Sequence, residues 1–157
     1  MSRRSASPVV SVSSSQRAVR VPRKRIAELV AFVARAERAP AAQVDVAVVG
    51  AEEIASLNRR YLRHAGPTDV LSFDLSAPGD EELTAQVVVC GPVAVAEAAA
   101  RHLRPQHELM LYVVHGLLHL LGHDDGTACD AERMHAREEE LLGEFLAHCR
   151  RRRGGRT

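Results

Sequence analysis

Hydrophobic residues recur along the chain with two different periods, and the change between these periods separates expected strands from expected helices. Four short segments alternate between apolar and polar residues or are continuously apolar. We expect these to be strands, at residues 9–13, 44–49, 70–73 and 86–90. Five longer segments place apolar residues three or four positions apart. We expect these to be helices, at about residues 22–40, 51–61, 93–101, 106–121 and 129–148.

Two of the expected helices have distinctive surfaces. Residues 106–121 are apolar on nearly every side, which predicts a helix buried in the core. In the 51–61 helix we expect Ile54, Leu57 and Tyr61 to share one side.

The order of the elements predicts the fold class. Some connections between the expected strands are too short for a crossover helix, so we expect an α+β fold with a mixed four-stranded sheet packed with about five helices. One domain should span residues 9–149. The Ser/Arg-rich residues 1–8 and the basic residues 150–157 should form disordered tails.

Composition limits the class of protein. The 157 residues are 46% hydrophobic and 26% charged, as in an ordinary globular domain. No run of about 18 apolar residues predicts a membrane span, and the N-terminus has no apolar core of a secretory signal. The three cysteines are far apart and odd in number, which argues against a disulfide framework. We therefore expect a cytoplasmic protein with no membrane contact and no disulfide-linked partner.

The charge is balanced overall but unevenly distributed. The formal net charge is only +1, yet basic residues gather at 17–25, 59–63 and 150–156. Basic patches of this size attract phosphate backbones. An ordinary solvated surface explains the same residues equally well.

The segment HGLLHLLGHDD, residues 115–125, carries the candidate chemistry. His115 and His119 lie four apart, so on a helix their imidazoles are neighbours and can bind one metal ion. Gly122 can adopt the left-handed conformation that ends a helix, and Asp125 can then fold back to the same ion. Three protein ligands leave a coordination position open, as in catalytic zinc sites.

Alternatives remain at this motif. His123 is an alternative third ligand if the helix continues through Gly122, and Asp124 is a candidate partner for a ligand imidazole. The spacing is that of H-E-x-x-H-x-x-G-x-x-H hydrolases, but Gly116 replaces the glutamate that serves as general base in metalloproteases. A metalloprotease-like hydrolase is therefore the weaker interpretation.

The same motif resembles the H-G-x-L-H-L-x-G-x-D-H signature of the YbeY family of rRNA maturation factors, which are single-strand endoribonucleases. Residues 57–61 (LNRRY) and 67–73 (PTDVLSF) are similar to the family's L-N-x-x-Y and P-T-D-V-L-S-F blocks. Glu108, Met134 and residues 138–142 also match the helices around its motif. The resemblance covers about residues 44–147.

The resemblance implies a zinc-dependent endoribonuclease that acts in maturation of the 3′ end of small-subunit rRNA and in ribosome quality control. Its partners would be ribosomal RNA and the small ribosomal subunit. One Zn²⁺ per chain would be held by His115, His119 and Asp125, where the family usually has a third histidine. This departure puts metal affinity and metal preference in question.

Other residues of the matching blocks are candidates for substrate binding. An arginine that the family associates with activity falls on Leu62, so Arg63, one position later, is the candidate catalytic residue. We expect Arg59 and Arg60 to contact RNA phosphates. Thr68 and Ser72 are candidate substrate contacts, with a role in the turn or core as the alternative. Because of Leu62 and Asp125, a non-catalytic ribosome assembly factor with a structural metal remains a second hypothesis.

Overall fold

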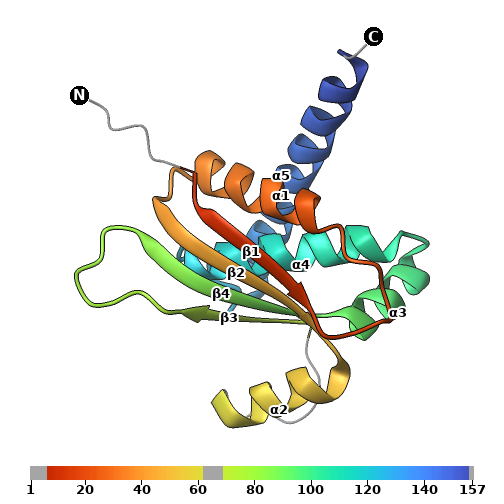
Figure 1. Cartoon of the computed structure of the whole chain (residues 1–157), viewed down its shortest axis with the longest axis horizontal. Coiled ribbons are helices and arrows are strands. Elements are labelled where there is room, and N and C mark those ends of the chain that lie inside the picture. Colours follow the sequence, from red (N-terminus) through yellow and green to blue (C-terminus); the bar gives the residue numbers. More distant parts are fainter. Residues whose placement is uncertain (1–6, 62–68, 156–157) are drawn as a thin grey trace.

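The computed structural model describes residues 7–61 and 69–155 (Figure 1). Its elements follow the order β1 (Val9–Ser14), α1 (Arg23–Ala36), β2 (Ala41–Val49), α2 (Ala51–Tyr61), β3 (Val70–Asp74), β4 (Leu83–Cys90), α3 (Gly91–Arg101), α4 (Pro105–Leu120) and α5 (Ala128–Gly154). The predicted α+β class is confirmed: a four-stranded mixed sheet is packed with helices in a single domain.

The sheet has the strand order β1-β2-β4-β3. β1, β2 and β4 are parallel, whereas β3 runs antiparallel to β4. β2 and β4 each begin three residues earlier than predicted, because Ala41 pairs with Leu83 across the two strands. Backbone pairing thus extends both strands beyond the segments that the pattern of apolar residues predicts.

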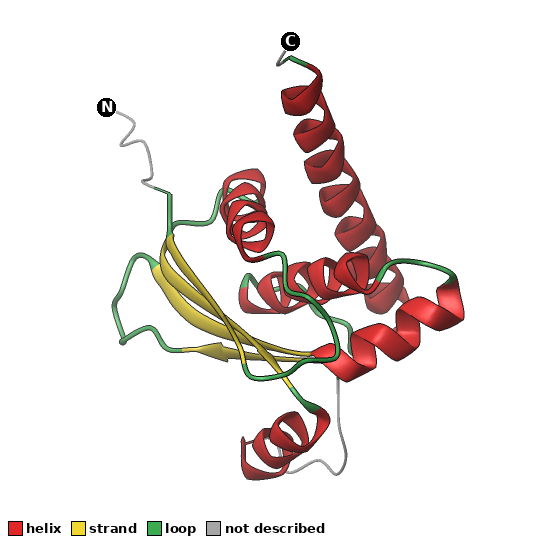
Figure 2. Cartoon of the chain, turned by 45° about the vertical axis from the view of Figure 1, so that its right-hand side comes forward, coloured by secondary structure: helices red, strands yellow, loops and turns green. Residues whose placement is uncertain are grey.

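Helices cover both faces of the sheet. Val46, Val48, Val87 and Val89 point into the main core, which α1, α4 and α5 complete. Side chains at the alternate positions point the other way, and Val88 packs there with Ile54 of α2. Figure 2 shows α2 below the sheet, α1, α4 and α5 above it, and α3 beside the end of the sheet. The sheet is therefore the middle layer, and α4 lies on its better covered face.

Helix α4 is buried along almost its whole length, as predicted. Leu109, Val113, Val114 and Leu118 have no exposed surface. Glu108, in the first turn, is also only 1% exposed and pairs with Arg101 of α3 at 3.5 Å. It therefore does more than favour the helix N-terminus through the macrodipole, because its charge is neutralised inside the fold.

Helix α2 has the predicted apolar side, and helix α5 is longer than predicted. In α2, Ile54 is buried, but Tyr61 is 57% exposed and Leu57 is only half-buried, whereas Asn58 is buried. Tyr61 packs edge-on against Phe73. Ile54 and Leu57 pack in the cluster that Phe73 joins, so the three residues share one side of α2, as predicted. Helix α5 continues to Gly154, beyond the predicted end at His148, because its arginine run favours a helix.

All three cysteines are free thiols: Cys90 and Cys149 are buried and Cys129 is exposed. Over residues 7–61 and 69–155, no helix has the length and hydrophobicity needed to cross a bilayer.

Candidate metal centre

The candidate ligands are positioned by the way helix α4 ends. The N–H of Gly122 donates to the carbonyl of His119, and the N–H of His123 donates to the carbonyl of Leu118, at 3.1 and 3.0 Å. Gly122 has a φ of +96°. These features form a Schellman motif, which glycine favours because a side chain would strain the left-handed backbone. The chain therefore reverses after α4, as predicted from the sequence.

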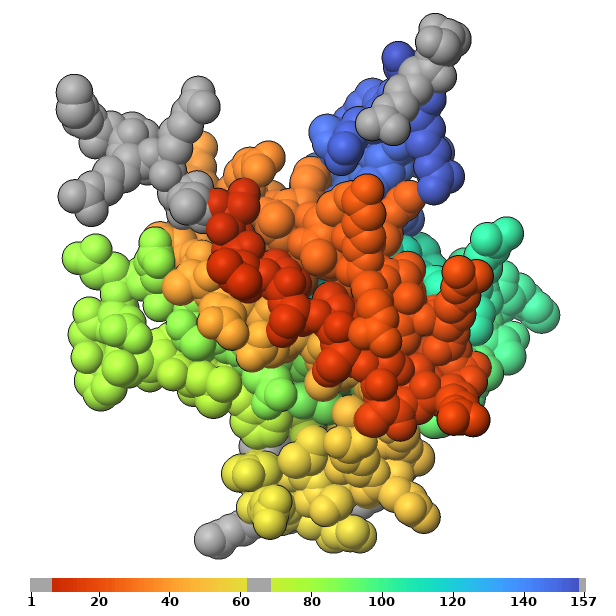
Figure 3. Space-filling view, viewed as in Figure 1, coloured from red at the N-terminus to blue at the C-terminus, as the bar shows by residue number. Residues whose placement is uncertain are grey.

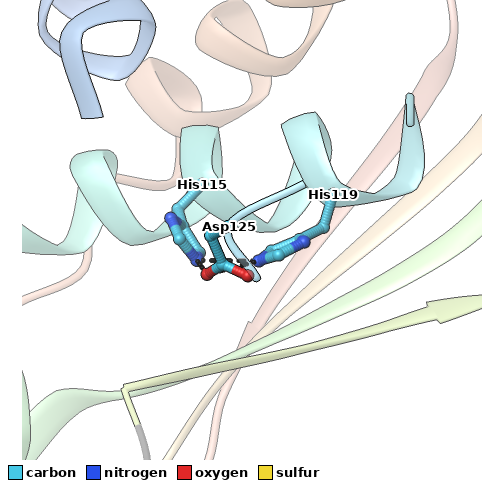
Figure 4. Close-up of side chains that lie close together, drawn as sticks. All are labelled: His115, His119 and Asp125. Carbon is cyan, nitrogen blue, oxygen red and sulfur yellow. Dashed lines mark hydrogen bonds and ion pairs between the residues drawn. The ribbon is translucent and has the colours of Figure 1, made fainter. Parts of the chain in front are cut away.

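This reversal brings three side chains together (Figure 4). The Nε2 atoms of His115 and His119 lie 3.1 Å apart. The Oδ2 atom of Asp125 lies 3.3 Å from Nε2 of His119 and 3.8 Å from Nε2 of His115. All three potential ligand atoms thus lie within 4.8 Å of one another.

These separations suit one small divalent cation. Ligands at 2.0–2.1 Å from a tetrahedral zinc ion stand about 3.3 Å apart, close to the distances between the three side chains. The side chains of His115, His119 and Asp125 are 26%, 35% and 43% exposed, so solvent reaches the site. Two imidazoles and one carboxylate are an acceptable donor set for zinc, and three ligands would leave a fourth position open.

Glu138 of α5 orients His115. One oxygen of its carboxylate accepts a hydrogen bond from Nδ1 of His115, and the other lies 3.5 Å from Nδ1 of His135. Since Nδ1 donates to Glu138, the neutral ring carries its lone pair on Nε2, the atom that faces His119 and Asp125. Glu138 itself is only 5% exposed. The carboxylate therefore fixes both the tautomer and the direction of a candidate ligand.

The charges around His115 favour its protonated form when no cation is present. Burial alone would lower the pKa of His115, but the hydrogen bond and negative charge of Glu138 outweigh it, with smaller contributions from Asp69 and Asp125. The net result is a raised pKa. The same carboxylates stabilise any cation placed at the centre, because they supply negative charge in a partly buried environment.

A pocket of about 480 Å³ adjoins the centre. His115 and Asp125 line it together with residues of α3, α4 and α5, and with Asp69, which precedes β3. Tyr112, one turn before His115, is buried there, and burial and nearby carboxylates raise its pKa. The pocket could admit a small portion of a substrate next to the metal centre.

The two alternatives at the motif are not supported by the geometry. His123 lies beyond the helix end, and its Nε2 atom is 3.3 Å from Glu37 of α1 instead of facing the other histidines. Asp124 accepts a hydrogen bond from the N–H of Gly126, so it stabilises the turn. Glu138 is hydrogen-bonded to the imidazole of the candidate ligand His115, a role considered for Asp124 from the sequence.

Ser72 and Gly116 join β3 to α4. The Ser72 hydroxyl donates to the carbonyl of Gly116 at 2.9 Å. A Cβ atom at residue 116 would lie 2.8 Å from Ser72 Oγ and from Val87 Cγ1. There is consequently no space for a glutamate at the position that carries the general base in metalloproteases. The contact gives Ser72 a structural role, and its RNA contact stays a prediction.

The remaining predicted site residues lie apart from the centre or outside the described residues. Arg59 and Arg60 are exposed in the last turn of α2, and neither lines the pocket beside His115. Arg60 lies over the Tyr61 ring, 5.9 Å from its centroid. Leu62, Arg63 and Thr68 lie outside the described residues, so their proposed roles stay predictions.

Sequence reasoning did not assign a role to Glu138, although a signal was present. Glu138 lies in a run of three glutamates, but it alone falls four residues from both Met134 and Leu142, which are buried. A carboxylate on the apolar stripe of a helix needs a buried partner. The partner could not be identified, because no local spacing connects residue 138 with residue 115.

The chain is similar to known proteins over most of its length. The family model described as "Endoribonuclease YbeY" matches residues 11–146. Relatives named "Endoribonuclease YbeY" include one from Geobacillus kaustophilus, 38% identical over 76% of this chain and 84% of that protein. Another, from Anaeromyxobacter, is 39% identical over 88% of this chain and 71% of its own length.

A solved structure shows the same fold. The solution structure of a protein from Thermotoga maritima matches with a TM-score of 0.62 and 22% identity, over 92% of this chain and 93% of that one. At this identity the likeness concerns the fold alone. With the family match over most of the chain and the curated relatives above 30% identity, this protein belongs to the endoribonuclease YbeY family.

Proposed function

We propose that this protein is a zinc-dependent endoribonuclease that cleaves single-stranded RNA during maturation of the 3′ end of small-subunit rRNA, and that it takes part in ribosome quality control. Its partners would be ribosomal RNA and the small ribosomal subunit, in the cytoplasm. Two findings support the proposal: the relatives carry the name endoribonuclease, and three metal-ligand side chains converge beside a pocket.

The convergence of His115, His119 and Asp125 is the observation that carries the proposal. A structural zinc site is closed by four protein ligands, whereas the described residues supply three and leave them partly exposed. Zinc, when bound, would supply a Lewis acid for a phosphodiester oxygen and lower the pKa of a water molecule. This openness favours the enzyme over an assembly factor with a purely structural metal.

The protein's own residues would orient the reaction. Glu138 holds the His115 ring with Nε2 toward the centre, and the turn at Gly122 delivers the Asp125 carboxylate. Asp69, Glu97 and Glu138 make the lining of the pocket acidic. Phosphate would therefore bind there only when a cation compensates these charges, which couples RNA binding at the centre to metal occupancy.

Cleavage of precursor rRNA tests the proposal. Wild-type protein with one equivalent of zinc should cleave a small-subunit precursor near its 3′ end, and chelation followed by added zinc should abolish and restore cleavage. His115→Ala should be inactive. His148→Ala, which removes an exposed histidine near the end of α5, serves as the matched control and should remain active.

Elemental analysis gives an independent readout. Protein purified without a histidine tag should contain about one zinc per chain, and Asp125→Ala should lose most of it. If wild type and His115→Ala give identical products while zinc is present, the metal is structural and the nuclease assignment is wrong. If casein is cleaved and RNA is not, the protein is a protease in spite of Gly116.

A further inference from the structure

A second concave surface lies between the start of α1 and the end of α5. It encloses about 580 Å³, and its lining is basic, with one acidic side chain, Glu28. The cations that line it are Arg20, Arg23, Lys24, Arg25, Arg152 and Arg153. We call this surface the basic groove. Figure 3 shows the end of α5 (blue) projecting beyond α1 (orange).

The groove cations are not neutralised by the fold. Ion pairs of arginines with described carboxylates involve only Arg101 and Arg137, and none of them reaches the groove. The guanidinium of Arg23 instead donates to the backbone carbonyl of Val12 at 2.7 Å. Several like charges thus face one cavity, an arrangement that costs free energy unless an anion binds.

The beginning of α1 adds to this positive potential. The helix starts after Pro22 with no side-chain cap and with no acidic residue in its first turn. Arg23, Lys24 and Arg25 occupy that turn, although the macrodipole disfavours cations there. The positive end of the helix dipole and three cations at the helix N-terminus favour phosphate oxygens there.

Helix α5 supplies the opposite wall with defined geometry. Cys149 is buried and lines the groove. Arg152 and Arg153 follow it by three and four residues, so they share its face of the helix. Arg150 and Arg151 do not line the groove. One helical turn therefore carries two groove arginines and two arginines outside it, which makes a matched comparison possible.

We propose that the basic groove binds the phosphate backbone of single-stranded RNA at a segment several nucleotides away from the cleaved bond. This inference rests on the proposed nuclease function. From Glu138 to Arg152, α5 advances about 21 Å, which corresponds to about six nucleotides of a stacked strand. Because none of the described residues that line the groove is aromatic, binding there should be independent of base sequence.

The chemistry favours RNA over an acidic peptide. Arginine forks match phosphate oxygens in a bidentate manner, and evenly spaced phosphates can contact both walls of a groove. The groove also lies on the same chain as the proposed nuclease centre, so the backbone of one substrate could contact both. The groove would increase affinity for long substrates without taking part in the cleavage itself.

Fluorescence anisotropy with labelled oligouridylates of 6 and 20 nucleotides tests the proposal. For the 20-mer, Arg152→Gln/Arg153→Gln should raise Kd roughly tenfold, and the slope of log K against log salt should fall by about 1.4, or 0.7 for each lost contact. The control Arg150→Gln/Arg151→Gln removes the same charge and should change Kd less than threefold. Lys24→Gln/Arg25→Gln should reproduce the effect from the α1 wall.

The outcomes separate this proposal from the nuclease proposal. If the groove variants cleave the 6-mer as wild type does but bind the 20-mer more weakly, the groove assignment is supported. If both arginine pairs weaken binding equally, only net charge matters and the groove assignment is wrong, while cleavage is unaffected. If polyglutamate of equal charge competes as well as RNA, the groove is a general polyanion surface. If the wild-type protein does not cleave RNA, the nuclease proposal itself is wrong.

Discussion

Residue 116 is the point where helix α4 and the sheet come closest. A Cβ atom there would meet Ser72, Val87 and Val70 at 2.8 to 3.0 Å, distances that real Cβ atoms do not tolerate. The glycine lies between the two candidate histidine ligands on α4, and Ser72 donates to its carbonyl. Because glycine has no side chain, α4 can approach β3 closely. This approach sets the distance of His115 and His119 from β3.

We predict that Gly116→Ala lowers the free energy of unfolding by about 1–3 kcal/mol, because β3 must move away from α4. Gly143→Ala is the matched control: it is also a helical glycine, and its Cβ would meet nothing within 4 Å. That variant should gain about 0.5–1 kcal/mol from helix propensity. Urea denaturation of both variants measures the difference, and equal stabilities would contradict the close packing.

Glu138 gives a second prediction at the scale of single residues. Glu138→Gln keeps the shape of the side chain but removes the charge that orients His115, so zinc affinity should fall by about 10–100-fold. Competition with a chromophoric chelator measures this affinity. The neighbouring Glu139→Gln removes an exposed charge outside the centre and should change affinity little. A zinc affinity unchanged in Glu138→Gln would exclude a positioning role.

At the scale of elements, the way helix α4 ends determines where Asp125 lies relative to the two histidines. The Schellman motif at Leu118 to His123 places Asp125 next to histidines that belong to the preceding helix. The cap of α5, where the Thr127 hydroxyl accepts from the N–H of Asp130, begins the next helix two residues later. The turn that carries Asp125 is therefore only a few residues long and is fixed on both sides, by the end of α4 and by the start of α5.

We predict a graded effect of substitutions at Gly122. With φ at +96°, Gly122→Ala should destabilise the fold by about 1–2 kcal/mol and weaken zinc binding, because the turn that carries Asp125 is strained. Gly122→Asn should cost less, since asparagine tolerates left-handed backbone. Thermal denaturation with and without zinc compares them. Equal losses for alanine and asparagine would contradict control of this turn by the left-handed backbone at Gly122.

At the scale of the whole molecule, Glu37 connects three parts of the chain. Its carboxylate, at the end of α1, accepts from Arg137 of α5 at 2.7 Å and lies 3.3 Å from His123 in the turn after α4. Burial would raise the pKa of Glu37, but Arg137 and His123 outweigh it, and the net shift is downward. Hydrogen bonding to Glu37 in turn raises the pKa of Arg137.

The lowered pKa has a defined consequence for stability. The ionised Glu37 carboxylate stabilises the fold at pH values above the pKa of glutamate in the unfolded chain, about 4.3. This contribution is lost as the pH falls through the pKa of Glu37 in the folded protein. Glu37→Gln should therefore cost about 1–2 kcal/mol at pH 7 and have a shallower loss of stability in acid. Glu144→Gln, an exposed residue of α5, is the control. Parallel pH profiles for wild type and Glu37→Gln would refute the prediction.

The spacing of apolar residues located nearly every helix and strand, because an element that buries one face must carry apolar residues at the period of that face. The 51–61 helix has the predicted bounds, and the buried character of α4 was evident from its apolar surface. Strand starts at Ala41 and Leu83 were missed, since small or polar residues there are held by pairing between strands. The end of α5 was missed because arginines extend a helix without any apolar pattern.

The metal motif was also predictable, because its histidines and its aspartate are connected by local helix and turn geometry. Sequence alone therefore determined the elements, the fold class and the ligands His115, His119 and Asp125 as a candidate set. Only the tertiary structure decided that Glu138 orients His115, that Gly116 makes room for β3 and that α1 and α5 form one basic groove. These contacts join segments far apart in the chain, and their free energy depends on packing that no local pattern encodes.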